Sequence, residues 1–128
     1  MRDVRRLSEI RDFQDLEVWQ LGKRLAVMAY EATRALPASE MYGLTSQIRR
    51  AAVSVPANVA EGFGRYHHAD RIKFLLYARG SLNELKSHLL IASELNFIDR
   101  AALRGVLDLV ETLSVKLNNF ISTIRNYP

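Results

Sequence analysis

The sequence predicts an all-α protein: an up-down-up-down antiparallel four-helix bundle that assembles as a ring-shaped homo-oligomer. Four segments repeat apolar residues at alternating spacings of three and four, the period of a helix with one buried face. Short links join the segments, which makes consecutive helices antiparallel neighbours. We expect a flexible tail over residues 1–12 and a bundle over 13–128, with helices at about 14–36, 40–63, 69–95 and 100–125.

The composition is typical of one globular domain. The chain has 128 residues, of which 48% are hydrophobic and 25% are charged. It has no cysteine, which excludes disulfide bonds and thiolate chemistry. No apolar run approaches the roughly 20 residues of a membrane span, and the N-terminus lacks the apolar stretch of a signal peptide. We therefore expect a cytoplasmic protein that does not contact membranes.

The net charge of +4 comes from the middle of the chain. Residues 42–90 carry seven basic and three acidic side chains, whereas the flanking segments are balanced. Such an excess suits a polyanionic partner, RNA or DNA, although arginines on solvated helix faces are the alternative explanation. The side chains that we assign to nucleic-acid binding are Arg49, Arg71, Lys73, Arg79 and Lys86.

The first helix is expected to begin near Gln14 or Asp15, either of which can cap it, and to end before Pro37. Its apolar stripe is Val18, Leu21, Leu25, Met28 and Ala32. An apolar cluster stands at its start: Phe13, Leu16 and Trp19. Because aromatic residues at helical spacing usually pack, we expect this cluster to seal one end of the core rather than to bind a ligand.

The second helix, with Ser39 as its expected cap, carries three different stripes. One is apolar and faces the core: Leu44, Ile48, Ala51, Val55 and Val59. Beside it runs a polar stripe: Gln47, Arg50, Ser54, Asn58, Glu61 and Arg65. The third stripe should face water, yet it is small and uncharged: Ser46, Val53, Ala57, Ala60 and Gly64. A helix without a charged solvent face is usually buried on more than one side, so we expect a second copy of the chain to cover this stripe.

The polar stripe has three interpretations. It can be a network that sets the register between helices or subunits, with Arg50, Asn58, Glu61 and Arg65 bonded to a neighbouring element, and this is the interpretation we adopt. It can instead be a groove for the phosphates of RNA or DNA, or a catalytic site. Pro56, inside the same helix, removes a backbone hydrogen bond and predicts a local distortion.

The third and fourth helices have regular apolar seams. The third begins near His68 to Asp70, and its seam is Leu75, Ala78, Leu82, Leu85, Leu89 and Ala92. Gly80 in its middle predicts a close backbone approach. Asp99 is the expected cap of the fourth helix, whose seam is Leu103, Val106, Val110, Leu113, Leu117, Phe120 and Ile124.

Signals of catalysis are weak, and we expect no enzymatic activity, no cofactor and no metal. The serines on the second and third helices lack a nucleophile-elbow motif, and the glycine pair at 62 and 64 follows a helix rather than a strand. The alternative is a hydrolytic or metal-dependent enzyme that uses the link residues His67, His68 and Asp70, with His88 as a further ligand. Neighbouring histidines splay apart on a helix, which weakens that alternative.

Three motifs resemble one known family. The run from Tyr42 to Arg65, with YGL, QIRRAA, SV, NVAEG and GR at their places, resembles the signature of the four-helix-bundle family encoded in 23S ribosomal RNA intervening sequences. The F-x-x-L-x-V-W motif of that family is similar to Phe13, Leu16, Val18 and Trp19. Its A-x-G-S-L-x-E-L motif is similar to Ala78, Gly80, Ser81, Leu82, Glu84 and Leu85, preceded by Phe74 and Leu75.

The resemblance implies a helical bundle that assembles as a ring-shaped homopentamer, in a family whose biochemical role is unsettled. A similar fold serves as the accessory variability protein of diversity-generating retroelements, which binds nucleic acid and a reverse transcriptase. This chain does not resemble that protein in sequence, so the role transfers only as an analogy of fold. The link Tyr66-His67-His68 departs from the small polar and basic residues that the family leads us to expect there.

Overall fold

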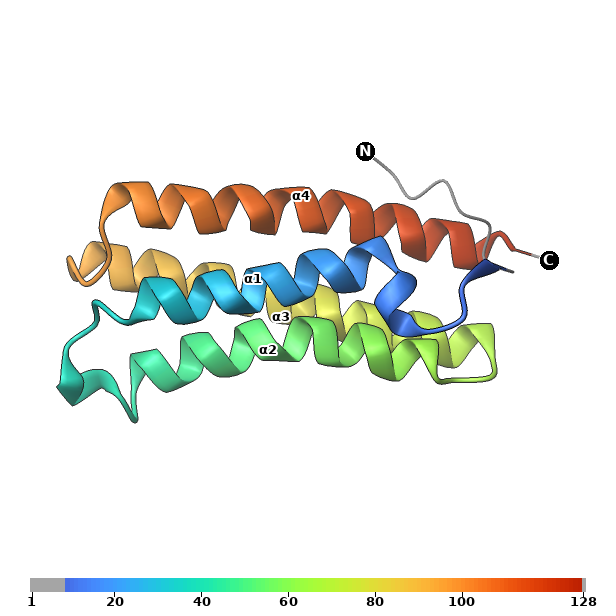
Figure 1. Cartoon of the computed structure of the whole chain (residues 1–128), viewed down its shortest axis with the longest axis horizontal. Coiled ribbons are helices and arrows are strands. Elements are labelled where there is room, and N and C mark those ends of the chain that lie inside the picture. Colours follow the sequence, from blue (N-terminus) through green and yellow to red (C-terminus); the bar gives the residue numbers. More distant parts are fainter. Residues whose placement is uncertain (1–8, 128) are drawn as a thin grey trace.

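The computed structural model describes residues 9–127 and places most of them in helices (Figure 1). The four α-helices are α1 Glu17–Thr33, α2 Leu44–Phe63, α3 His68–Glu94 and α4 Arg100–Arg125, and two 3-10 turns are η2 Phe13–Asp15 and η3 Ala38–Glu40. No strand occurs between residues 9 and 127, so the prediction of an all-α chain with four helices is confirmed.

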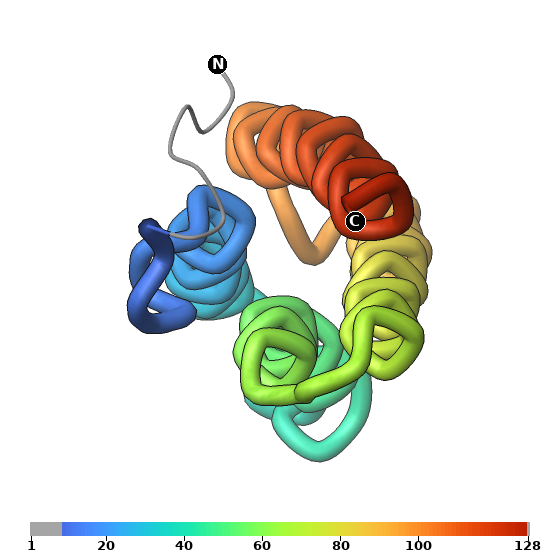
Figure 2. Tube along the Cα trace, turned by 90° about the vertical axis from the view of Figure 1, so that its right-hand side faces the viewer, coloured from blue at the N-terminus to red at the C-terminus, as the bar shows by residue number. Residues whose placement is uncertain are grey.

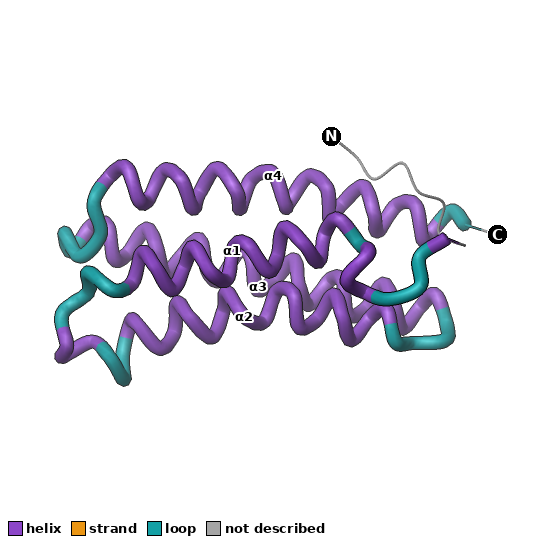
Figure 3. The backbone as a smooth tube through the Cα atoms, in the orientation of Figure 1, coloured by secondary structure: helices purple, strands orange, loops and turns teal. Residues whose placement is uncertain are grey.

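The helices lie side by side along the long axis of the molecule. In Figure 1 the chain turns back at each of its three links, and Figure 3 shows that the links lie at the two ends. Seen from one end, the helices surround a common interior in chain order (Figure 2). Each helix contacts the next along the chain, and α1 also contacts α4. Each helix therefore turns one face toward the interior, and its remaining surface faces a neighbouring helix or the outside of the bundle.

The interior is built mainly from the predicted seams. Every predicted seam residue of α3 is buried, as are Ile48, Ala51, Val55 and Val59 of α2. On α4, Phe120 is only half-buried and Ile121 joins the core, since an ideal helix drifts against a strict seven-residue repeat. Within the described residues, no helix is both long and apolar enough to cross a membrane.

The buried stripe of α1 is displaced from the predicted one. Val18 and Leu25 are buried as expected, but the other buried positions are Gly22, Ala29 and Thr33, while Leu21, Met28 and Ala32 are half-buried. The displacement follows from a close contact with α2, because a Cβ atom on Gly22 would lie 3.2 Å from Cβ of Pro56. Pro56 is itself buried, and α2 continues through it to Phe63.

The helix starts differ from those predicted for α1 and α2. The carboxylate of Asp15 accepts backbone N–H groups of Arg11 and Asp12, which closes the η2 turn and delays α1 to Glu17. The segment after Pro37 forms η3 instead of the first turn of α2, so Ser39 does not cap α2. The α2 N-terminus is instead served by Glu40, whose Oε1 accepts the N–H of Leu44 at 3.2 Å.

The C-terminus of α3 and the N-terminus of α4 each have a standard helix cap. Asp99 caps α4 as predicted, with its Oδ1 accepting the Ala102 N–H at 2.8 Å. Asn96 has φ of 61° and stops α3, while the Phe97 N–H bonds the Ala92 carbonyl and the Asn96 N–H bonds the Ser93 carbonyl. This pair of bonds is the Schellman arrangement, in which asparagine tolerates the left-handed conformation.

Gly80 on α3 and the N-terminal segment differ from their predictions in different ways. The predicted close approach at Gly80 is wrong within this chain, since no atom lies within 4 Å of a Cβ built there and the residue is exposed. The reason is that Gly80 lies outside the buried seam of α3. Of the predicted tail, residues 1–8 lie outside the described residues, and Ile10 packs half-buried against the core.

Candidate functional site

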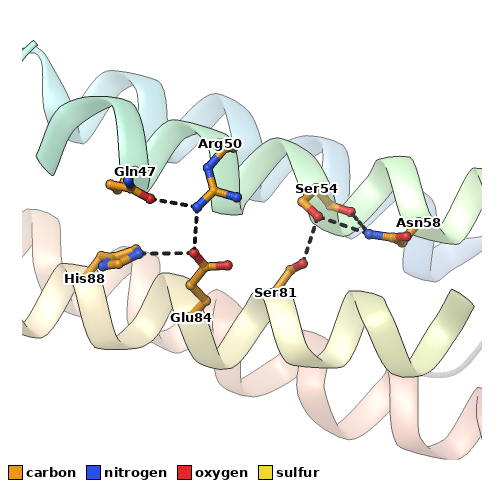
Figure 4. A network of polar contacts seen from close by, with 7 residues as sticks. All are labelled: Gln47, Arg50, Ser54, Asn58, Ser81, Glu84 and His88. Atoms are coloured by element: carbon orange, nitrogen blue, oxygen red, sulfur yellow. Dashed lines mark hydrogen bonds and ion pairs between the residues drawn. The ribbon is translucent and has the colours of Figure 1, made fainter. Parts of the chain in front are cut away.

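The polar stripe of α2 lies along the boundary with α3 (Figure 4). Near its start, Nη2 of Arg50 donates to Oε1 of Gln47 at 2.7 Å and to Oε2 of Glu84 at 2.9 Å. The same Glu84 oxygen lies 3.3 Å from Nε2 of His88. Arg50 is 62% exposed and Glu84 is 38% exposed, so this group is a surface network, for which a contribution of at most about 1 kcal/mol is typical.

Further along α2, the stripe is less exposed and consists of hydroxyl and amide groups. The hydroxyls of Ser54 and Ser81 are 2.8 Å apart, and the Asn58 amide donates to the Ser54 carbonyl at 2.9 Å and to its hydroxyl at 3.0 Å. Because each hydroxyl is engaged with the other, neither serine has a base as its partner. This arrangement joins α2 to α3 and does not form a nucleophile–base pair.

The last part of the stripe is an ion pair between α2 and the link that follows it. Nη2 of Arg65 donates to Oε2 of Glu61 at 2.6 Å, and both side chains are about half exposed. Of the six stripe residues, Arg50 and Ser54 bond to side chains of α3, and the side chains of Gln47, Asn58 and Glu61 bond within the stripe. Arg65 also contacts α3, since its guanidinium lies 4.5 Å from the centre of the Phe74 ring. Sequence reasoning did not identify the partners on α3, although Ser81, Glu84 and His88 recur at spacings of three and four and form a matching polar stripe.

The small stripe of α2 faces away from the core. Ser46, Val53, Ala57 and Gly64 are exposed, and Ala60 is half-buried. The cation beside it, Arg49, is directed toward α1: its Nε donates to the Thr33 hydroxyl at 2.9 Å, and its guanidinium lies 4.5 Å from the centre of the Tyr30 ring. The stripe therefore combines small side chains with the exposed Val53, and the exposed ring of Tyr30 on α1 lies against the neighbouring Arg49.

The five basic residues assigned to nucleic acid do not form one surface. Arg49 bonds to α1, whereas Arg79 donates to Oδ1 of Asn118 on α4. Lys86 lies further along α3. Arg71 and Lys73 share the first turns of α3 beside the α2–α3 link, but their side chains take different partners, since Lys73 lies beside Asp70 and the Phe74 ring. Nε of Arg71 donates to the Arg65 carbonyl at 2.7 Å.

The histidines assigned to the alternative metal site point to different partners. The His67 ring packs on Tyr66, the His68 ring packs on Tyr127, and His88 lies beside Glu84. Across residues 9–127, no three His, Asp or Glu side chains are close enough together to hold a metal ion.

A cavity of about 160 Å³ lies at the end of the bundle where the residues on either side of η2 meet the end of α2, the start of α3 and the end of α4. Its lining includes Leu16, Phe63, Leu75 and Phe120. Arg71 is the one charged residue among the lining residues, and its Nε is engaged with the backbone of the α2–α3 link. The cavity therefore offers an apolar wall and one guanidinium, without a nucleophile or a general base.

The comparisons with known proteins agree with the sequence motifs. The family model of the 23S rRNA-intervening sequence protein matches residues 14–119. A crystal structure from Bacteroides thetaiotaomicron, of a protein with unknown function from the S23 ribosomal protein family, has a TM-score of 0.75 and 23% sequence identity. The alignment covers 81% of this chain and 97% of that chain, and at this identity the likeness establishes the fold alone. Among curated proteins, none matches. Since the family model spans most of the sequence, this chain belongs to the 23S rRNA-intervening sequence protein family.

Proposed function

We propose that this protein is a non-enzymatic cytoplasmic scaffold: an up-down-up-down bundle whose copies associate through the small stripe of α2 into a closed ring of five, with weak affinity for RNA or DNA. The observation that carries the proposal is the uncharged face formed by Ser46, Val53, Ala57, Ala60 and Gly64, of which all but the half-buried Ala60 are exposed. Surface helices of monomeric proteins normally turn charged side chains outward. This face instead leaves room for the backbone of another helix to approach closely, since interaxial distances depend on the side chains at the contact.

A ring, rather than a two-fold dimer, is favoured by the presence of a second exposed apolar group. Leu90, Ile91 and Leu95 lie near the C-terminal end of α3, and each is about half exposed. When two different surfaces of one chain bind each other, the contact repeats from head to tail and closes into a ring if the rotation allows it. The α2 face and the α3 group are two such surfaces.

Replacement of a small residue on the α2 face tests the assembly. We expect Ala57→Glu to reduce the mass measured by light scattering at tens of micromolar to that of a monomer, with the helical circular dichroism retained. The matched control is Ala101→Glu, an exposed alanine in the first turn of α4, which should leave the mass unchanged. A wild-type protein that is monomeric at this concentration would overturn the proposal, as would an Ala57→Glu variant that keeps the full mass.

The proposed affinity for RNA or DNA is based on the net positive charge of the chain. The formal charge of +4 is repeated on each copy, so a ring would present a multivalent basic surface even if each protomer contributed one or two phosphate contacts. Such binding would tolerate many sequences and weaken steeply with salt. Titration of a labelled, structured RNA at low salt tests this branch, and a complete lack of binding would remove it.

A further inference from the structure

Aromatic and basic side chains gather around the link between α2 and α3. We name this group the aromatic-basic cluster; it consists of Arg65, Tyr66, His67, Arg71, Lys73, Phe74 and Tyr77. The link between the two helices is short, running from Gly64 to His67, so the end of α2 and the first turns of α3 lie next to each other. The cluster contains Tyr66 and His67, two of the three residues at which the sequence departs from the expectation for the family.

Two tyrosines of the cluster expose their rings to solvent. Tyr66 is 86% exposed and meets His67 edge to face, with ring centres 4.9 Å apart. Tyr77 is 53% exposed and meets Phe74 in the same manner, with ring centres 5.5 Å apart. An edge-to-face pair covers at most one face of each ring, so every ring keeps a face that this partner does not cover. With so much of its surface in water, Tyr66 adds little to the stability of the core.

Two cations of the cluster lie beside the Phe74 ring. The Arg65 guanidinium lies 4.5 Å and the Lys73 ammonium 5.3 Å from the centre of the Phe74 ring. Two carboxylates are nearby: Glu61 pairs with Arg65 at 2.6 Å, and Asp70 is 4.0 Å from Lys73. Arg71 donates to a backbone carbonyl rather than to a carboxylate, so its charge adds to the local positive potential.

We propose that the aromatic-basic cluster is a stacking platform for single-stranded nucleic acid. Bases would stack on the free faces of Tyr66 and Tyr77, and the phosphates would lie near the exposed ammonium of Lys73. Every base has a flat face, so stacking on exposed aromatic rings supplies affinity without sequence preference, and nearby cations follow the backbone. Bases in a duplex are already stacked and paired, so the platform favours single strands. The inference rests on the proposed nucleic-acid binding and assigns a place and a substrate class to it.

Fluorescence anisotropy with labelled twelve-nucleotide probes tests the platform. The probes are oligo(U) RNA, oligo(dT) DNA and a duplex of the same length, at low salt. We expect both single strands to bind more tightly than the duplex. Tyr66→Ala should weaken single-strand binding by about tenfold, the loss typical of one stacked base, whereas Tyr66→Phe keeps the ring and should bind like the wild type.

The chain offers a matched control for the exposed tyrosine. Tyr42 is 98% exposed, and its segment lies in the link at the opposite end of the bundle (Figure 1). Tyr42→Ala removes an equally exposed ring far from the cluster and should leave binding unchanged. For charge, Lys73→Gln should reduce the slope of log K against log salt by about 1, while Arg104→Gln, an exposed cation in the first turns of α4, should not. Unchanged circular dichroism shows that each variant is folded.

Two results separate the failure of the platform from the failure of nucleic-acid binding altogether. If the wild type binds single strands but Tyr66→Ala and Tyr77→Ala bind equally well, the platform is refuted and the general basic surface remains. Equal binding of the duplex and of the single strands would also refute the platform. If the wild type binds none of the probes at low salt, both proposals fall.

Discussion

The contact between Gly22 and Pro56 makes a quantitative prediction about the packing of α1 on α2. In Gly22→Ala, the new methyl group would lie 3.2 Å from Cβ, 3.3 Å from Cα and 3.4 Å from Cδ of Pro56. Favourable carbon–carbon contacts lie at about 3.5–4.0 Å, and all three atoms belong to a rigid ring or to the backbone. The two helices would have to separate, because no flexible side chain can move aside.

The magnitude follows from two opposing terms. Alanine in place of glycine inside a helix gains about 1 kcal/mol of intrinsic stability. Overpacking a closely packed contact costs about 1–3 kcal/mol. We therefore expect Gly22→Ala to be destabilising by roughly 1 kcal/mol. Gly80→Ala is the matched variant without the clash, since no atom lies within 4 Å of the new methyl group, and it should be stabilising by about 1 kcal/mol.

Urea denaturation followed by circular dichroism measures both variants at one protein concentration, because the stability of an oligomer depends on that concentration. The predicted order of the free energy of unfolding is Gly80→Ala, wild type, Gly22→Ala. If Gly22→Ala were as stable as Gly80→Ala, the contact with Pro56 would not be as close as described, and the explanation of the α1 register would be wrong.

Three further stability predictions use the same assay. Glu61→Ala should cost no more than about 0.5 kcal/mol, since its pair with Arg65 is half exposed and lies one helical turn away; a cost near 3 kcal/mol would show that another chain buries the pair. Asp99→Ala should cost about 1 kcal/mol by leaving the Ala102 N–H without its cap, while Asp99→Asn should retain most of the stability. Asn96→Ala should cost about 1 kcal/mol at φ of 61°, and Asn96→Gly should be close to neutral.

The helices of the fold were predictable because their signal is periodic. The seam of α3 could be read directly from leucine and alanine spacing, and Asp99 marked the start of α4. The register of α1 could not be read in this way, since it depends on Gly22 lying against Pro56, a residue on another helix. The late start of α2 depends on the η3 turn, which no apolar period reports.

The sequence predicted which face of α2 carries the polar residues of the candidate site, but not the partners of these residues. The spacing of the polar stripe placed it on one side of α2, and the side chains of Arg50 and Ser54 form hydrogen bonds with side chains of α3. The grouping of the cations was not predictable, because it depends on which neighbour each helix face meets. Arg49 and Arg79 belong to the same basic stretch of sequence, residues 42–90, as the other candidate cations. Their side chains nevertheless bond to α1 and α4 respectively. Tyr66 was visible as an unexpected residue, but its exposure became clear only from the structure.

Self-assembly through the small stripe of α2 is the central claim, and the native mass of the wild-type protein tests it most directly. Native mass spectrometry, supported by light scattering at tens of micromolar, should give a single species of about 73 kDa, five times the 14.6 kDa chain. A closed ring of another size would correct the number of copies and keep the claim. A single species at 14.6 kDa would contradict it, because the exposed face of Val53, Ala57 and Ala60 would then have no second copy to cover it.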